Sequence, residues 1–193
     1  MKDKIFMIAF VLVLGSVWTT ALVGVDAWTS PIIEKHTQAK QRASILKALG
    51  ISYEEGNIDA AFAGNVEKSE DGGLEVYRSR EGAIAFKIAG SGVQDQISGV
   101  LALEKDLKTI KGITIVAQKE TPGLGDRVFE PETLARFKGK VLFPEFHILP
   151  PGRASKENEV DGVTSATLTC QALQKILNAE AKKYRDAIKG RVE

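Results

Sequence analysis

The sequence predicts an α+β protein in which one membrane-spanning helix precedes a domain with a mainly antiparallel sheet and a long carboxy-terminal helix. Residues 5–25 contain no charged side chain. Four short runs of β-forming residues lie between residues 74 and 119, separated by glycine-containing or charged turns. Apolar residues recur at helical spacing over residues 168–188, near the end of the chain. Together these patterns predict an anchor, a sheet and a packed helix, in that order.

The uncharged run at residues 5–25 is long enough to cross a membrane. A helix of 21 residues is about 31 Å long, which matches the hydrocarbon core of a bilayer. A cleaved signal peptide is the alternative, but its apolar region is usually about 7–15 residues long, and Asp26 makes a poor cleavage site. We therefore expect an uncleaved anchor. Lys2 and Lys4 precede the run, so the positive-inside rule predicts a cytoplasmic tail at residues 1–4 and an extracytoplasmic domain.

Composition excludes several classes of function. The chain is 44% apolar and 26% charged, as in globular proteins. Residues 26–193 hold 24 basic and 24 acidic side chains, which argues against nucleic-acid binding because that needs a basic excess. Cys170, His36 and His147 are too few for an intramolecular disulfide, a thiolate cluster or a zinc site. Any redox chemistry would therefore need an organic cofactor and no metal cluster.

Each element of the domain has its own sequence signal. Residues 37–49 have an apolar helical stripe that ends before Gly50, within a juxtamembrane linker at residues 26–50. The domain proper is expected over residues 51–193. Its strands are predicted at residues 74–79, 83–89, 97–103 and 110–119, followed by a short helix at 131–137 and proline-containing irregular or edge structure at 141–155. Antiparallel pairing is favoured because the gaps between strands are too short for crossover helices.

Small and hydroxyl residues cluster directly before the last helix. The segment reads Asp161-Gly162-Val163-Thr164-Ser165-Ala166-Thr167. Free backbone N–H groups at a helix amino terminus favour an anion such as a phosphate. An ordinary capped helix is the alternative, since Ser and Thr are common N-caps. The residues alone leave both interpretations open.

Two motifs resemble those of a known family. Asp161, Thr164, Ala166 and Thr167 fill the pattern Asp-x-x-(Ser/Thr)-Gly-Ala-(Thr/Ser) that flavin transferases recognise, with Ser165 in the place of the usual Gly. The run Glu120-Thr121-Pro122-Gly123-Leu124-Gly125 is similar to a loop of the RnfG/NqrC family. Members of this family carry FMN in the Rnf electron-transport complex and in the sodium-pumping NADH:quinone reductase. The short chain is more like the Rnf member.

The resemblance implies a covalent FMN, attached by a phosphoester to the hydroxyl of Thr167. It implies that Asp161, Thr164, Ser165 and Ala166 belong to the segment that the transferase reads. It further implies that Glu120, Thr121 and Leu124 contact the isoalloxazine ring, Leu124 by apolar packing and the other two as polar contacts. The turn Gly90-Ser91-Gly92 is expected to let backbone approach the cofactor.

The resemblance also implies a role as an electron relay that has no substrate site of its own. Expected partners are membrane subunits of an Rnf-type ferredoxin:NAD oxidoreductase, together with a flavin transferase during maturation. Three alternatives remain: a stand-alone covalent flavoprotein, the homologous NqrC component of the sodium-translocating NADH:quinone reductase, and a scaffold without cofactor. A thiol at a helix amino terminus has a lowered pKa, so Cys170 has either a redox role or, more commonly, a packing role.

Overall fold

The computed structural model describes residues 2–189 and confirms the α+β class. The chain divides into two compact units, residues 1–39 and residues 40–193. The elements, in chain order, are α1 (Lys2–Ala48), the single-turn η1 (Glu55–Asn57), α2 (Ile58–Asn65), β1 (Val66–Asp71), β2 (Leu74–Ser79), β3 (Ile84–Ser91), β4 (Gln96–Leu103), β5 (Ile110–Ala117), η2 (Gly125–Phe129), α3 (Pro131–Ala135), β6 (His147–Leu149), β7 (Glu159–Asp161) and α4 (Thr167–Lys189).

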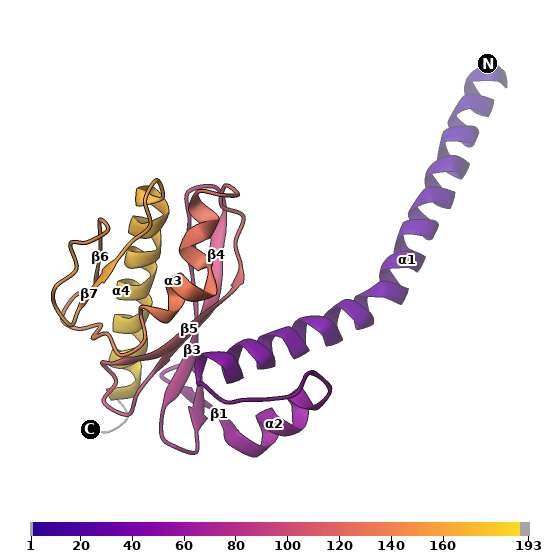
Figure 1. Cartoon of the computed structure of the whole chain (residues 1–193). Coiled ribbons are helices and arrows are strands. Elements are labelled where there is room, and N and C mark those ends of the chain that lie inside the picture. The colour runs from indigo at the N-terminus through magenta and orange to yellow at the C-terminus, as the bar shows by residue number, and fades with distance from the viewer. Residues whose placement is uncertain (1, 190–193) are drawn as a thin grey trace. The chain divides into compact units, whose positions relative to one another are not determined.

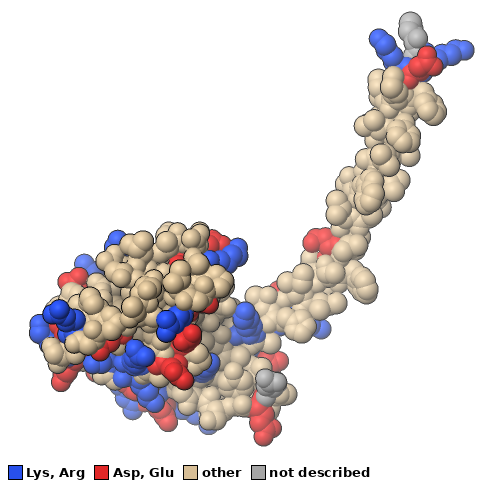
Figure 2. All heavy atoms as spheres, turned by 45° about the horizontal axis from the view of Figure 1, so that its top comes forward, with Lys and Arg blue, Asp and Glu red and all other residues tan. Residues whose placement is uncertain are grey.

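The first unit is a single stretch of helix. Within residues 2–189, α1 is the one helix long and apolar enough to cross a membrane. Its side chains over residues 5–25 are exposed and uncharged, with charged residues at the amino-terminal tip (Figure 2). Helix continues through residues 26–39 without a break. The expected anchor and juxtamembrane helix are therefore parts of one element, whose last residues belong to the folded unit.

Five strands form an antiparallel sheet in the order β1-β2-β3-β4-β5. The four predicted strands correspond to β2–β5, and β2 has the predicted bounds. Strand β1 was not predicted. Its sequence is charged and only its two end residues are buried, so it lacks the alternation by which a strand is recognised. Strands β6 and β7 form a short parallel pair; β6 lies in the part of the chain expected to be irregular or edge structure, and β7 follows that part.

The sheet is covered on both faces (Figure 1). One face packs against the carboxy-terminal end of α1 through Ile45, Leu46 and Leu49, with α2 beside it. Helix α1 ends in a Schellman motif: Gly50, at φ +72°, donates to the carbonyl of Lys47, and Ile51 donates to that of Leu46.

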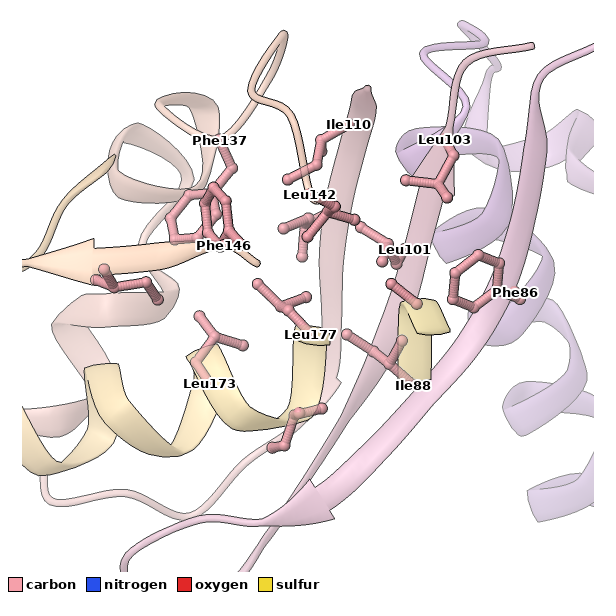
Figure 3. Close-up of a cluster of buried hydrophobic side chains, with 14 of the residues drawn as sticks. Phe86, Ile88, Leu101, Leu103, Ile110, Phe137, Leu142, Phe146, Leu173 and Leu177 are labelled. Carbon is pink, nitrogen blue, oxygen red and sulfur yellow. The ribbon is translucent and has the colours of Figure 1, made fainter. Parts of the chain in front are cut away.

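The other face of the sheet packs against α4. Figure 3 shows Leu173 and Leu177 of α4 directed toward strand residues such as Ile88 and Leu101, with Phe146 filling one end. This apolar stripe fixes α4 on the sheet, and α4 begins at Thr167. The packing therefore determines where the predicted attachment residue lies.

Candidate functional site

The hydroxyl residues before α4 are exposed. Thr167 is the first residue of the helix and is solvent-exposed, as are Thr164 and Ser165, whereas Ala166 is 4% exposed. Ser165 has φ +67°, a left-handed conformation that glycine adopts readily and other residues only at a cost. The position at which the transferase pattern usually has Gly thus has glycine-like backbone geometry in this chain.

The loop that follows Glu120 turns sharply. The N–H of Leu124 donates to the carbonyl of Thr121 at 3.2 Å, and Gly123 supplies the positive φ of +74°. Thr121 and Leu124 are exposed, Leu124 at 46%. Both side chains are therefore available to a ligand.

Glu120 is placed differently from its neighbours. Only 5% of it is exposed. Its Oε1 accepts the N–H groups of Val93 at 2.8 Å and of Gln94 at 3.2 Å, and its Oε2 accepts the hydroxyl of Thr169 at 2.8 Å. The motif resemblance implies that Glu120 contacts the flavin ring. In the structure, both carboxylate oxygens bind protein groups.

Three exposed apolar side chains lie on the segments that Glu120 joins or close to them in the chain. Among the described residues of the folded unit, Val93, Leu124 and Leu168 are the exposed large hydrophobics, at 47%, 46% and 66%. The N–H of Val93 binds Glu120, Leu124 follows Glu120 by four residues, and Leu168 precedes Thr169. We call these three side chains the apolar patch. Val93 and Leu168 were not predicted from the sequence. Leu168 lies off the apolar stripe of α4, and this position could have indicated an exposed apolar side chain.

Asp161 holds a neighbouring loop. Its Oδ1 accepts the N–H groups of Arg153 at 2.9 Å and Ala154 at 3.0 Å. Hydrogen bonds from these backbone groups, that of Ala154 first, lower the pKa of Asp161 below its ordinary value despite partial desolvation. The carboxylate thus shapes the loop that precedes the attachment segment.

A cleft of about 450 Å³ lies between that loop, β6 and the start of α4. Its lining includes Pro150, Thr167, Cys170 and Gln174. Cys170 is buried, and burial raises the pKa of its thiol. The expectation that the helix terminus lowers the pKa of this thiol is therefore wrong, because desolvation outweighs the hydrogen bond from the backbone.

Residues 92–182 match the family model of the FMN-binding domain. This segment is similar to an FMN-binding domain. It contains the turn at Gly92, the loop at residues 120–125 and the attachment segment, so both resembling motifs fall inside it.

Curated proteins similar to this chain include C subunits of Na(+)-translocating NADH-quinone reductases. The protein from Vibrio vulnificus is 38% identical over 97 residues, covering 47% of this chain and 38% of that protein. The protein from Neisseria meningitidis is 34% identical over 112 residues, covering 55% and 41%. The chain thus matches about two fifths of the length of these relatives.

Two solved structures have a similar fold. The NqrC component of the Na(+)-translocating NADH-quinone reductase from Parabacteroides distasonis has a TM-score of 0.71 at 18% identity, covering 81% of this chain and 95% of that one. NqrC from Shewanella oneidensis has a TM-score of 0.65 at 22% identity, covering 72% and 91%. The structural likeness covers more of the chain than the 91 residues that the family model matches.

Proposed function

We propose that the protein is a membrane-anchored electron carrier whose FMN is esterified through its phosphate to Thr167. The observation that carries this proposal is the exposed hydroxyl of Thr167 at the first residue of α4, inside a segment that fits the transferase pattern. A phosphodiester placed there would be stabilised by the free N–H groups and the dipole of the helix terminus.

The residues around Thr167 fit the rest of the cofactor. The three exposed side chains of the apolar patch are available for apolar contact with a flat aromatic ring. Thr121 lies in the same turn as Leu124 and supplies a hydroxyl for the polar edge of the ring. The cleft beside Cys170 is the other place that Thr167 borders. We favour the patch because its side chains are the exposed large hydrophobics of the described part of the domain.

Bound FMN would supply one- and two-electron redox chemistry. The protein would contribute tethering by Thr167, shielding of the ring from water by the apolar patch, and orientation by the loop at residues 120–125. Asp161, Thr164, Ser165 and Ala166 would present the attachment segment to a flavin transferase during maturation. The protein needs no substrate site of its own for this role.

We further propose a single-pass topology with the amino terminus in the cytoplasm and the FMN-binding domain outside, because Lys2 and Lys4 precede the apolar run. Its partners would be membrane subunits of an Rnf-type complex. The named relatives favour a second candidate, the NqrC component of a sodium-translocating NADH-quinone reductase. Purification from native membranes in mild detergent separates the candidates. Co-purification of Rnf-type subunits would support the first candidate, and co-purification of quinone-reductase subunits would support the second. If neither set of subunits co-purifies, the result would support a stand-alone carrier.

Co-expression of the full chain with a flavin transferase tests the attachment. A denaturing gel under ultraviolet light is expected to show fluorescence in the wild-type and Thr167→Ser bands and none in the Thr167→Ala band. Thr121→Ala is the matched control, because this exposed threonine lies in the site but outside the attachment segment. A dark wild-type band, or a fluorescent Thr167→Ala band, would overturn the proposal.

A further inference from the structure

We propose that Glu120 is a positioning residue that holds three segments of the flavin site in register: the turn at residues 92–94, the loop at residues 121–125 and the first turn of α4. This inference rests on the proposed function. The motif resemblance implies that Glu120 contacts the flavin ring. In this proposal the carboxylate instead binds protein groups that support the cofactor.

The hydrogen bonds of Glu120 join segments that are distant in the chain. Val93 and Gln94 lie 27 and 26 residues before it, and Thr169 lies 49 residues after it. In all three bonds the carboxylate is the acceptor, from two backbone N–H groups and one hydroxyl. Hydrogen bonds to a charged group are each stronger than those between neutral groups. One buried side chain therefore connects both sides of the site.

Two glycines allow the backbone to close around this carboxylate. A Cβ added to Gly92 would lie 2.4 Å from Oε1 of Glu120. A Cβ added to Gly125 would lie 2.6 Å from the hydroxyl oxygen of Thr169 and 3.0 Å from Cβ of Glu120. Real Cβ atoms essentially never lie closer than 3.0 Å to such an atom, so a larger residue at either position would require the Glu120 or Thr169 side chain to shift. The turn that contains Gly92 therefore lies close to Glu120, and its approach to the cofactor stays a prediction.

Each member of the apolar patch is attached to this arrangement. Val93 donates directly to Glu120, Leu124 precedes Gly125, and Leu168 lies between Thr167 and the Thr169 that binds Glu120. The relative positions of the patch and of the attachment hydroxyl therefore depend on Glu120. No ion pair among the described residues involves Glu120, and its three hydrogen-bond donors are uncharged groups.

Two substitutions of Glu120 separate the effect of its hydrogen bonds on the geometry of the site from the effect of its charge. Glu120→Gln can still accept from Val93 and Gln94 through its carbonyl and can donate its amide to the Thr169 oxygen. It keeps the geometry and removes the charge. Glu120→Ala removes both. A third substitution, Thr169→Val, removes only the bond to α4.

The experiment uses the full chain loaded with FMN in detergent, and measures quenching of flavin fluorescence by iodide and the midpoint potential. Glu120→Ala and Thr169→Val are expected to keep the flavin and to show a larger quenching constant than wild type, because the ring loses its fixed support. Glu120→Gln is expected to retain the wild-type quenching constant with a higher midpoint potential, because loss of a nearby negative charge favours the reduced flavin.

A purely structural role gives a different result. It would lower the melting temperature of Glu120→Ala or Thr169→Val while leaving quenching and potential unchanged in the folded protein, and this outcome would overturn the proposal. If Glu120→Ala does not fold, Thr169→Val and Glu120→Gln still decide. A wild-type chain without flavin would instead contradict the proposed function, so the two failures are distinguishable.

Discussion

Glu120 and Asp161 use one carboxylate oxygen in the same way, to accept two consecutive backbone N–H groups from a loop. For Glu120 the donors are Val93 and Gln94; for Asp161 they are Arg153 and Ala154. The two differ in reach and in burial. Glu120 is buried and joins segments 26 to 49 residues away, whereas Asp161 is half-buried and its donors are 7 or 8 residues away.

This difference indicates which contact should control the tertiary arrangement of the site. A buried carboxylate that loses a partner leaves an uncompensated polar group, at a cost of roughly 1–3 kcal/mol or more. A solvated carboxylate exchanges its partner for water at little cost. Disturbing Glu120 should therefore move the site as a whole, and disturbing Asp161 should change one loop.

The largest effect on stability is expected from Gly92→Ala. The added methyl group would lie 2.4 Å from Oε1 of Glu120 and 2.6 Å from the carbonyl oxygen of Asp95, and the second contact is with backbone that cannot rotate away. Overpacking of this kind typically costs about 1–3 kcal/mol. Urea unfolding of the full chain in detergent, followed by circular dichroism, measures it.

Gly64→Ala is the matched control for this substitution. Gly64 lies in α2 with no atom within 4 Å of the added Cβ, and alanine in a helix is favoured over glycine by about 1 kcal/mol. Its stability should stay equal or rise. If Gly92→Ala behaves like Gly64→Ala, the turn does not close tightly on Glu120.

Ser165→Gly is expected to have a smaller effect of opposite sign. Relief of the left-handed conformation at φ +67° gains about 1–2 kcal/mol, and the greater freedom of glycine in the unfolded chain offsets part of it, about 0.5–1 kcal/mol. The melting temperature should rise slightly. The fluorescent fraction after co-expression with a transferase should equal or exceed that of wild type, and a fall in both quantities would contradict the strain at this residue.

Substitutions in the apolar patch should hardly change stability. Leu124→Ser and Leu168→Ser alter exposed side chains, so the free energy of unfolding should stay within about 0.5 kcal/mol of wild type. Iodide quenching of the flavin should increase in both variants, because each removes apolar cover from the ring. Lys138→Ser, which changes an exposed side chain after α3, is the control. Unchanged quenching in both leucine variants would favour the cleft beside Cys170 as the ring site.

The parts of the fold that the sequence predicted are those with local signals. Strands β2–β5 have alternating or β-branched residues between turn residues, and α4 has a long apolar stripe. Strand β1 and helix α2 were not predicted, because β1 is a charged edge strand and α2 has only eight residues. Their positions depend on the sheet against which they pack.

The candidate site divides in the same way. Thr167 and the loop at residues 120–125 are found from motifs that are continuous in the chain. The hydrogen bonds that Glu120 accepts from Val93 and Thr169 cannot be found from motifs, because they join residues far apart in sequence. The pKa of Cys170 was misjudged for a related reason, since the position in the helix is local but burial is not. Contacts between distant segments are what a single sequence does not reveal.

The smallest effect is expected at Asp161, and it depends on pH. Backbone hydrogen bonds hold the pKa of this carboxyl below its ordinary value of 3.8 in the folded state. The folded protein therefore gains stability from the ionised form above that ordinary value, and loses it as pH falls through the lower folded pKa. Asp161→Asn removes the charge, so its stability should be slightly below wild type at pH 7, and the difference should shrink as the solution is acidified below about pH 4.

Thermal unfolding of wild type and Asp161→Asn between pH 3 and pH 7 measures this difference. Glu159 lies nearby, and its pKa is also lowered, first by a hydrogen bond from the N–H of Ser155. The chains with and without Asp161→Asn are therefore also compared in a Glu159→Gln background. A difference that persists unchanged at pH 3 would mean that the carboxylate charge of Asp161 does not hold the loop. In those Asp161→Asn chains to which the transferase has attached flavin, quenching should stay at the wild-type level, because Asp161 orders one loop while Glu120 joins both sides of the site.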